Sequence, residues 1–123
     1  MRVLVVDDHP GFRRAVTSAL KMVKDIEIVG EASGGVEGAD RAVRGDADLV
    51  LMDLSMPDLD GIESMRRIHR TRPDLPVVIL TAHADPGVEK EAREAGASGF
   101  LAKGSALEDL VVILQDALVG PDG

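Results

Sequence analysis

The sequence predicts an α/β fold with a doubly wound, five-stranded parallel sheet in the flavodoxin-like order 2-1-3-4-5 and helices on both faces. Short apolar runs alternate along the chain with segments of helical periodicity, which is the pattern of parallel strands joined by crossover helices. Several of the runs are apolar throughout, as expected of strands that are buried on both faces. Right-handed crossovers leave few topologies, and among the doubly wound orders we choose the flavodoxin-like one.

The five expected strands are short, and most are rich in Val, Ile and Leu. The first of them leads directly into two adjacent acids, and the third ends next to a single acid. Residues of these types favour a pleated, buried strand. The expected strands are Arg2–Val6, Ile26–Ala32, Leu49–Met52, Val77–Thr81 and Gly99–Ala102.

Each segment between the strands places apolar residues three or four positions apart, which is the periodicity of a helix with one buried face. The pattern is weaker in the second and fourth segments, where Ala supplies much of the apolar face, and strongest in the last. Pro73 ends the third helix because proline cannot continue one. The expected helices are Pro10–Lys24, Gly35–Arg44, Gly61–Thr71, Pro86–Ala95 and Ala106–Val119.

The length of 123 residues and the apolar content of 45% predict one globular domain with a single core. We expect this domain to span residues 1–119 and residues 120–123 to begin a linker or end the chain. Without Cys, a signal pattern or an apolar run near 18 residues, the chain is expected to be soluble and cytoplasmic, with no membrane partner. A net charge of −8 and an aromatic content of 2% argue against direct contact with DNA.

Charged and polar residues follow four of the five strands. Asp7 and Asp8 follow the first, Asp53 the third, Thr81 ends the fourth, and Lys103 follows the fifth. Ligand sites of open α/β sheets lie outside the carboxyl ends of the strands, so we expect these side chains to meet. Three acids against one lysine leave the site about two charges short of neutral, and Mg²⁺ with oxygen ligands fits this deficit.

A single carboxylate beside such a metal site can act as a nucleophile and form an aspartyl-phosphate. Asp53 is best placed for this role because it stands alone at its strand end. Thr81 can donate its hydroxyl to a phosphoryl oxygen, and Lys103 can supply a point charge. For Asp7 and Asp8 alone, capping of the following helix is an equally good explanation. The set of residues on four strand ends is much more specific than any single member.

These residues carry a resemblance to a known family. Over essentially its whole length the chain resembles the receiver domain of two-component response regulators, and it is closest to the NarL/LuxR-type branch. VLVVDDHP is similar to the acidic pair of that family, LVLMDLSMPDLDG to its phosphorylation loop, VVILTAHAD to its switch threonine and GASGFLAKG to its lysine segment. Many receivers have Pro after the lysine, whereas this chain has Gly104, which tolerates unusual backbone angles.

The resemblance implies a phosphorylation-controlled switch that is not a metabolic enzyme and catalyses only its own phosphorylation and dephosphorylation. Asp53 would take the phosphoryl group from a sensor histidine kinase. Mg²⁺, with Mn²⁺ as an alternative, would contact the side chains of Asp8 and Asp53, Asp7 through water and the backbone carbonyl of Ser55. Phe100 stands where the family has its switch aromatic.

The resemblance also implies a transcriptional output through a C-terminal DNA-binding domain that this chain lacks. The final helix is a candidate dimer surface because Val112 and Ile113 add apolar area outside its core stripe. That stripe is expected to consist of Leu107, Leu110, Val111, Leu114 and Leu118.

Three other functions were weighed against this one. A haloacid-dehalogenase-type phosphatase needs two acids in a DxD arrangement, which Asp7-Asp8-His9 does not supply. A P-loop nucleotidase needs GxxxxGK[ST], which the sequence lacks. A stand-alone interaction module would not need the complete acidic set. The three histidines, His9, His69 and His83, lack ligand spacing and are interpreted as exposed polar residues.

Overall fold

Five parallel strands form one sheet in the order β2-β1-β3-β4-β5, which confirms the predicted topology. The computed structural model describes residues 1–119, so the expectation for residues 120–123 lies outside the described residues. The strands are β1 (Arg2–Val6), β2 (Glu27–Ala32), β3 (Leu49–Asp53), β4 (Val77–Thr81) and β5 (Gly99–Ala102). The helices are α1 (Pro10–Lys21), α2 (Gly35–Arg44), α3 (Gly61–Thr71), α4 (Pro86–Glu94) and α5 (Leu107–Val119).

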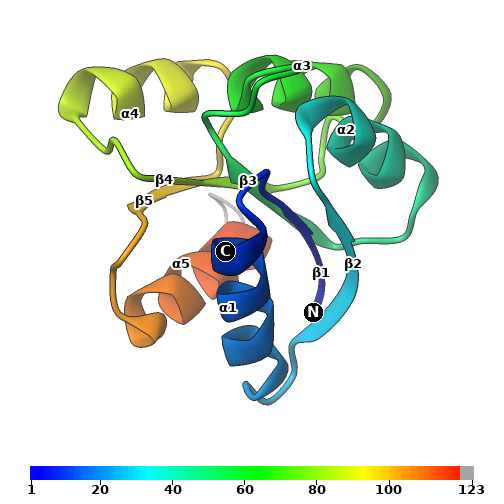
Figure 1. The fold of residues 1–123 in the computed structure, drawn as a ribbon. Helices are drawn as coiled ribbons and strands as arrows, with labels where there is room; N and C mark the ends of the chain where they lie inside the picture. The colour runs from blue at the N-terminus through cyan, green and yellow to red at the C-terminus, as the bar shows by residue number, and fades with distance from the viewer. Residues whose placement is uncertain (120–123) are drawn as a thin grey trace.

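The helices form two layers, one on each face of the sheet (Figure 1). Helices α2, α3 and α4 cover one face, and α1 and α5 cover the other. Alternate residues of the central strands enter the two cores: Val50 and Met52 pack toward α2 and α3, whereas Leu49 and Leu51 pack toward α1 and α5. Because β3 is buried on both faces, its run of apolar residues shows no alternation of apolar and polar positions.

The registers bring the carboxyl ends of four strands to one edge. Val6 of β1 lies beside Met52 of β3, and Asp53 pairs with Leu80 of β4. Thr81 in turn pairs with Ala102 of β5. The residues that follow β1, β3 and β5 therefore emerge at the same edge of the sheet, as the sequence predicts.

Some element ends differ from the predicted ones. Helix α1 ends at Lys21 instead of Lys24, because the backbone N–H groups of Met22 and Val23 turn to carbonyls three residues back and Asp25 takes a positive φ of 71°. Met22 is 89% exposed, so no core contact extends the helix there. Helix α4 stops at Glu94, α5 begins at Leu107, β2 begins at Glu27 and β3 includes Asp53.

The core stripe predicted for the last helix is wrong at both ends. Leu110 and Leu114 are buried, together with Ala117, whereas Leu107 and Leu118 are exposed. Helical spacing identifies the row of positions that faces the sheet, but burial along that row also depends on how far the sheet extends beneath the ends of the helix. The exposed side of α5 is consequently more apolar than predicted.

None of the helices within residues 1–119 is both long enough and apolar enough to span a lipid bilayer.

Candidate functional site

Two of the predicted acids are buried at the carboxyl edge of the sheet. The side chain of Asp7 follows β1 and that of Asp53 ends β3, and each residue is only 3% exposed. Asp8 lies between them and the surface, half-buried. Buried carboxylates are costly to desolvate unless a cation or hydrogen-bond donors accompany them.

Lys103 supplies a positive charge among these acids. Its Nζ lies 2.8 Å from Asp7 Oδ2 and 3.4 Å from Asp53 Oδ1. The same Nζ lies over the ring of Phe12, a residue of α1, at 4.4 Å from the ring centroid. This cation–π contact adds to the attraction that the carboxylates exert on the ammonium group.

The residue after Lys103 allows the chain to turn away at the end of β5. Gly104 has a φ of +90°, a region that residues with a Cβ rarely adopt. The prediction that glycine provides unusual backbone angles here is confirmed. The turn leads into α5 and keeps the lysine at the sheet edge.

Asp53 is harder to ionise than an ordinary aspartate. Burial and the charge of Asp7 raise the pKa of Asp53 to about 6, although Lys103 acts in the opposite direction. Without a metal ion, the positive charge of Lys103 is therefore too small to balance the three carboxylates, as the sequence predicts.

The donor set fits a hard divalent cation. One carboxylate oxygen from each of Asp7, Asp8 and Asp53 lies within 4.8 Å of the others. Asp8 Oδ1 and Asp53 Oδ2 are buried and lack a hydrogen-bond partner among the described residues. Unpaired buried oxygens of ionised groups are rare and call for a ligand. Carboxylate oxygens are ligands that Mg²⁺ prefers, so the residues fit the predicted ion.

The loop between β3 and α3 is fixed around the phosphoacceptor candidate. Asp60 caps α3 by accepting a hydrogen bond from the N–H of Glu63, at 2.9 Å. Asp58 accepts from the N–H groups of Gly35 and Val36 at the start of α2. These N–H groups, that of Val36 above all, hold the pKa of Asp58 below its ordinary value. The loop is thus tied to two helix N-termini.

A close approach of Gly61 also constrains this loop. A Cβ at Gly61 would lie 2.3 Å from the carbonyl oxygen of Asp53, so only glycine fits there. The N–H of Gly61 donates to the carbonyl of Leu54 at 2.8 Å. Both contacts hold the backbone immediately after Asp53.

The two predicted switch residues lie on β4 and β5. Thr81 is 1% exposed, and its Oγ1 accepts a hydrogen bond from the N–H of His83 at 3.2 Å. Its carbonyl accepts from the N–H of Lys103 at 2.7 Å. Phe100 is buried in the core beneath α3 and α4, at 7% exposure. The structure thus contains Phe100 in its inward position only.

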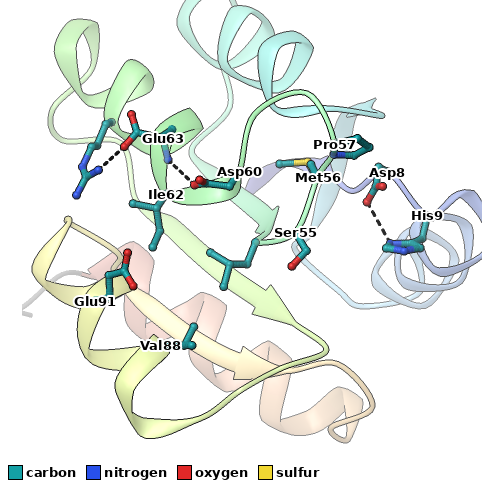
Figure 2. A pocket seen from close by; sticks show the side chains of 12 residues that line it. Asp8, His9, Ser55, Met56, Pro57, Asp60, Ile62, Glu63, Val88 and Glu91 are labelled. Atoms are coloured by element: carbon teal, nitrogen blue, oxygen red, sulfur yellow. Dashed lines mark hydrogen bonds and ion pairs between the residues drawn. The ribbon is translucent and has the colours of Figure 1, made fainter.

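A groove of about 540 Å³ leads from the acidic cluster between α3 and α4. Figure 2 shows Asp8 and His9 at one end, Ser55 and Pro57 beside them, and Val88 of α4 farther along. Ser55 is exposed on the wall of this groove, which Asp8 also lines. The metal role of its backbone carbonyl stays a prediction.

Sequence reasoning missed the place of His9. The residue is exposed as predicted, yet its Nδ1 faces all three acids, at 3.1 Å from Asp8 Oδ1, 3.2 Å from Asp7 Oδ1 and 3.6 Å from Asp53 Oδ2. Its position directly after the acidic pair was the available signal. The capping explanation for the pair is not supported, because His9 is itself the N-cap of α1 and no side chain caps that helix.

The other two histidines lie away from the acids. His69 is half-buried, which corrects the prediction of an exposed residue, since its Nε2 lies 2.9 Å from the carbonyl oxygen of Leu75. His83 is exposed as predicted. Neither belongs to the cluster of potential metal ligands within residues 1–119.

A doubly wound sheet that gathers a buried aspartate, an acidic pair and a lysine at its carboxyl edge defines a class of signalling domain that carries a phosphoacceptor aspartate. Residues 3–115 match the family described as response regulator receiver domain. The chain belongs to this family, and with it to the phosphoacceptor regulators of two-component signalling, which are not conventional enzymes. Membership implies a cognate histidine kinase.

Individual relatives agree with this assignment. Response regulator UvrY of Escherichia coli (strain K12) is 36% identical over 120 residues, which cover 98% of this chain and 55% of that protein. This chain therefore spans about half the length of that relative. The signal receiver domain of the response regulator NarL from Mycobacterium tuberculosis is 33% identical, with a TM-score of 0.88 and coverage of 97% of this chain and 96% of that one.

A third relative has been solved with a metal ion. The receiver domain of sensor histidine kinase PA1611 from Pseudomonas aeruginosa PAO1 has magnesium coordinated in its active-site cleft. It is 27% identical, with a TM-score of 0.86 and coverage of 97% of this chain and 98% of that one.

Proposed function

We propose that Asp53 accepts a phosphoryl group from a histidine kinase and that this modification switches a partner or dimer surface. The observation that carries the proposal is the environment of the Asp53 carboxylate. It is buried, its Oδ1 lies 3.4 Å from Lys103 Nζ, and its Oδ2 faces the acidic pair without a hydrogen-bond partner. One oxygen is therefore available to the phosphoryl group and the other to a cation.

The bonds that form and break in the transfer involve only the donor and this carboxylate, while Lys103 and the metal site balance the charge. Asp53 Oδ1 attacks the phosphorus of a phosphohistidine or of a small acyl phosphate. A P–O bond forms to Asp53 while the bond from phosphorus to the donor breaks, and the leaving group keeps that electron pair. Lys103 already lies beside Oδ1, so its ammonium group can follow the charge onto the transferred phosphoryl oxygens.

Mg²⁺, or Mn²⁺ in its place, would be held by Asp7, Asp8, Asp53 and the backbone carbonyl of Ser55. When bound, the ion neutralises negative charge that would otherwise repel the phosphoryl donor. Asp8 and Asp53 supply the two buried oxygens that lack a partner, so they are its direct side-chain ligands. Asp7 already accepts from Lys103 and from the N–H of His9, which suits a ligand that acts through water.

Thr81 and Phe100 would pass the modification to the surface. The Thr81 hydroxyl is held by one backbone N–H at 3.2 Å, so it can turn toward a phosphoryl oxygen on the neighbouring strand. That movement frees space beside β5, on which Phe100 lies. A ring with an inward and an outward position provides the two-state element that a switch requires.

The output would be dimerisation through α5 and control of transcription. Val112 and Val119 are exposed on that helix together with Leu107 and Leu118, and such an apolar surface is typical of an interface. DNA would be bound only by a C-terminal domain outside this chain. The net charge of −8 is unsuited to contacts with phosphate backbones.

Intact mass after incubation with acetyl phosphate and Mg²⁺ tests the proposal. We expect one labile phosphoryl adduct, no adduct in Asp53→Asn, and an undiminished adduct in the control Asp74→Asn, whose side chain is exposed away from the site. Asp8→Ala should lose metal affinity and adduct together while it remains folded. An adduct that persists in Asp53→Asn, or metal binding that is unchanged in Asp8→Ala, would overturn the assignment. A folded parent that takes no adduct would support a stand-alone interaction module instead.

A further inference from the structure

His9 adds a nitrogen ligand to the acidic cluster. Its Nδ1 lies 3.1 to 3.6 Å from one oxygen of each of the three aspartates. Four ligands in a tetrahedron around Zn²⁺, with bonds of about 2.0 to 2.1 Å, lie roughly 3.4 Å apart. The three distances from Nδ1 thus match this spacing, and all four atoms lie within 4.8 Å of one another. Figure 2 shows the imidazole of His9 turned toward Asp8 at the mouth of the groove.

Hydrogen bonds from the imidazole do not explain this arrangement. The ring nitrogen has hydrogen-bond geometry toward Asp7 Oδ1 only. Asp8 Oδ1 and Asp53 Oδ2 both face Nδ1, yet both lack a hydrogen-bond partner among residues 1–119. Asp53 is 3% exposed, so water does not readily compensate for the missing bond. One cation between Nδ1 and these two oxygens would satisfy both of them.

Coordination by His9 would leave no other group unpaired. Asp7 Oδ1 also accepts the backbone N–H of His9 at 2.8 Å, and that bond does not depend on the ring. Asp7 Oδ2 keeps Lys103. The imidazole is not required by α1 either, since His9 makes no side-chain capping hydrogen bond.

We propose that His9 converts this edge of the sheet into a mixed nitrogen and oxygen site that binds Zn²⁺ through Nδ1 and the carboxylates. Imidazole is a good ligand for Zn²⁺, whereas Mg²⁺ prefers oxygen ligands and retained water. A zinc ion with four protein ligands keeps no open position. Zinc therefore competes with Mg²⁺ and lowers phosphoryl transfer to Asp53. This inference rests on the metal site of the proposed function.

The decisive variant is His9→Asn, because an Asn Oδ1 replaces the ring Nδ1 with oxygen at a similar position. Asn is also favourable at a helix N-cap, so we expect the variant to fold. Titration calorimetry at one fixed pH would measure Zn²⁺ and Mg²⁺ affinities separately. We expect about a tenfold or greater loss of Zn²⁺ affinity. Mg²⁺ affinity should stay within about a factor of three, since its oxygen ligands remain.

A second measurement observes the ring itself. Upon addition of Zn²⁺, the ¹⁵N resonance of His9 Nδ1 should shift as that atom becomes a ligand, while the ring nitrogens of His83 keep their positions. His83→Ala is the matched control for the affinities because His83 is exposed near the same edge. It should bind both ions as the parent does. Zinc should also reduce the acetyl-phosphate adduct more in the parent than in His9→Asn.

The outcomes separate the two proposals. Equal losses of Zn²⁺ and Mg²⁺ affinity in His9→Asn, or no loss and an unmoved Nδ1 resonance, would overturn the role of His9. If Asp8→Ala still abolishes Mg²⁺ binding in that case, the proposed function survives. If Asp8→Ala leaves both ions bound as in the parent, the metal site of the proposed function fails, and the role of His9 fails with it.

Discussion

The ammonium nitrogen of Lys103 lies 2.8 Å from Asp7 Oδ2, closer than its 3.4 Å distance from the phosphoacceptor candidate. Both side chains are nearly buried, at 12% and 4% exposure. In the metal-free domain, therefore, Lys103 mainly neutralises the charge of Asp7 and to a lesser extent that of Asp53. A phosphoryl group on Asp53 would offer it a stronger partner, and the lysine is close enough to reach that group without a backbone movement.

Lys103→Gln should destabilise the metal-free domain by about 2 kcal/mol, because it leaves buried carboxylates without their cation. Urea unfolding in the presence of a chelator measures this change. Mg²⁺ should reduce the difference in free energy of unfolding between the variant and the parent, since the ion replaces the missing positive charge. Lys90→Gln is the control: Lys90 and Glu94 form an exposed pair at 3.9 Å, which contributes at most about 0.5 kcal/mol. Equal stability of parent and Lys103→Gln would show that the lysine does not compensate the acids.

The raised pKa of Asp53 predicts a pH dependence of stability with a definite sign. In the folded domain this pKa is about 6, compared with an ordinary value of 3.8. Between pH 3.8 and pH 6, therefore, the Asp53 carboxyl is mostly protonated in the folded state and mostly ionised in the unfolded state. The stability that this group contributes is complete below about pH 3.8 and is lost as the pH rises through 6.

Asp53→Asn should remove that dependence. The variant should gain stability over the metal-free parent as the pH rises from 4 to 7, up to about 3 kcal/mol for a shift of two pKa units. The measurement is the difference in free energy of unfolding between parent and variant across this range, with a chelator present. Asp74→Asn, at an exposed position, controls for the loss of one negative charge. A pH-independent difference would contradict the prediction.

The sequence predicted the sheet edge well because strand ends in a parallel sheet are fixed by register. Asp7 follows β1 and Asp53 ends the adjacent β3, so these two acids must lie side by side once the strand order is known. Lys103 emerges at the same edge after β5, two strands away from β1. Contacts that depend on the rotamer of a side chain could not be predicted from the sequence. Neither the turn of the His9 ring toward the acids nor the preference of Lys103 for Asp7 follows from spacing.

Helix ends and helix rotation were also less predictable than strands. Periodicity extended α1 to Lys24, but the chain leaves the helix after Lys21 because Met22 has no core to contact. Leu107 and Leu118 share helical spacing with the buried Leu114 but lie in the end turns of α5, where they are exposed. Burial at those turns depends on where the sheet ends, which is tertiary information.

Gly61→Ala adds only one methyl group, but we expect it to displace the backbone next to Asp53. The new Cβ would lie 2.3 Å from the carbonyl oxygen of Asp53, so the backbone after Asp53 must move. We expect a loss of about 2 kcal/mol or more in stability and slower phosphorylation by acetyl phosphate. Gly11→Ala is the matched control, because a Cβ added there would meet nothing within 4 Å beyond its chain neighbours and its own helix backbone, and alanine favours the helix. A Gly61→Ala domain with parental stability and phosphorylation would contradict the close approach.

Phosphorylation at β3 should be coupled to the core through Thr81 and Phe100. Thr81 ends β4, and Phe100 lies on the neighbouring β5, beside Ile79. If the Thr81 hydroxyl moves to the phosphoryl group, the Phe100 ring gains a second position, and both residues then act on one two-state element. The alternative is a ring fixed in the core, which its 7% exposure would equally explain.

A double-mutant cycle with Thr81→Ala and Phe100→Leu separates these alternatives. The measured quantity is the free energy of phosphorylation-driven dimerisation, and leucine keeps the core apolar. A shared element predicts a coupling energy of about 0.5 kcal/mol or more, whereas residues that act independently give additive effects. Ile68→Val in place of Phe100→Leu is the control, since Ile68 lies in the same core but on α3. Additivity in the first cycle, together with a Phe100 ring whose NMR signals do not change on phosphorylation, would make Phe100 an ordinary core residue.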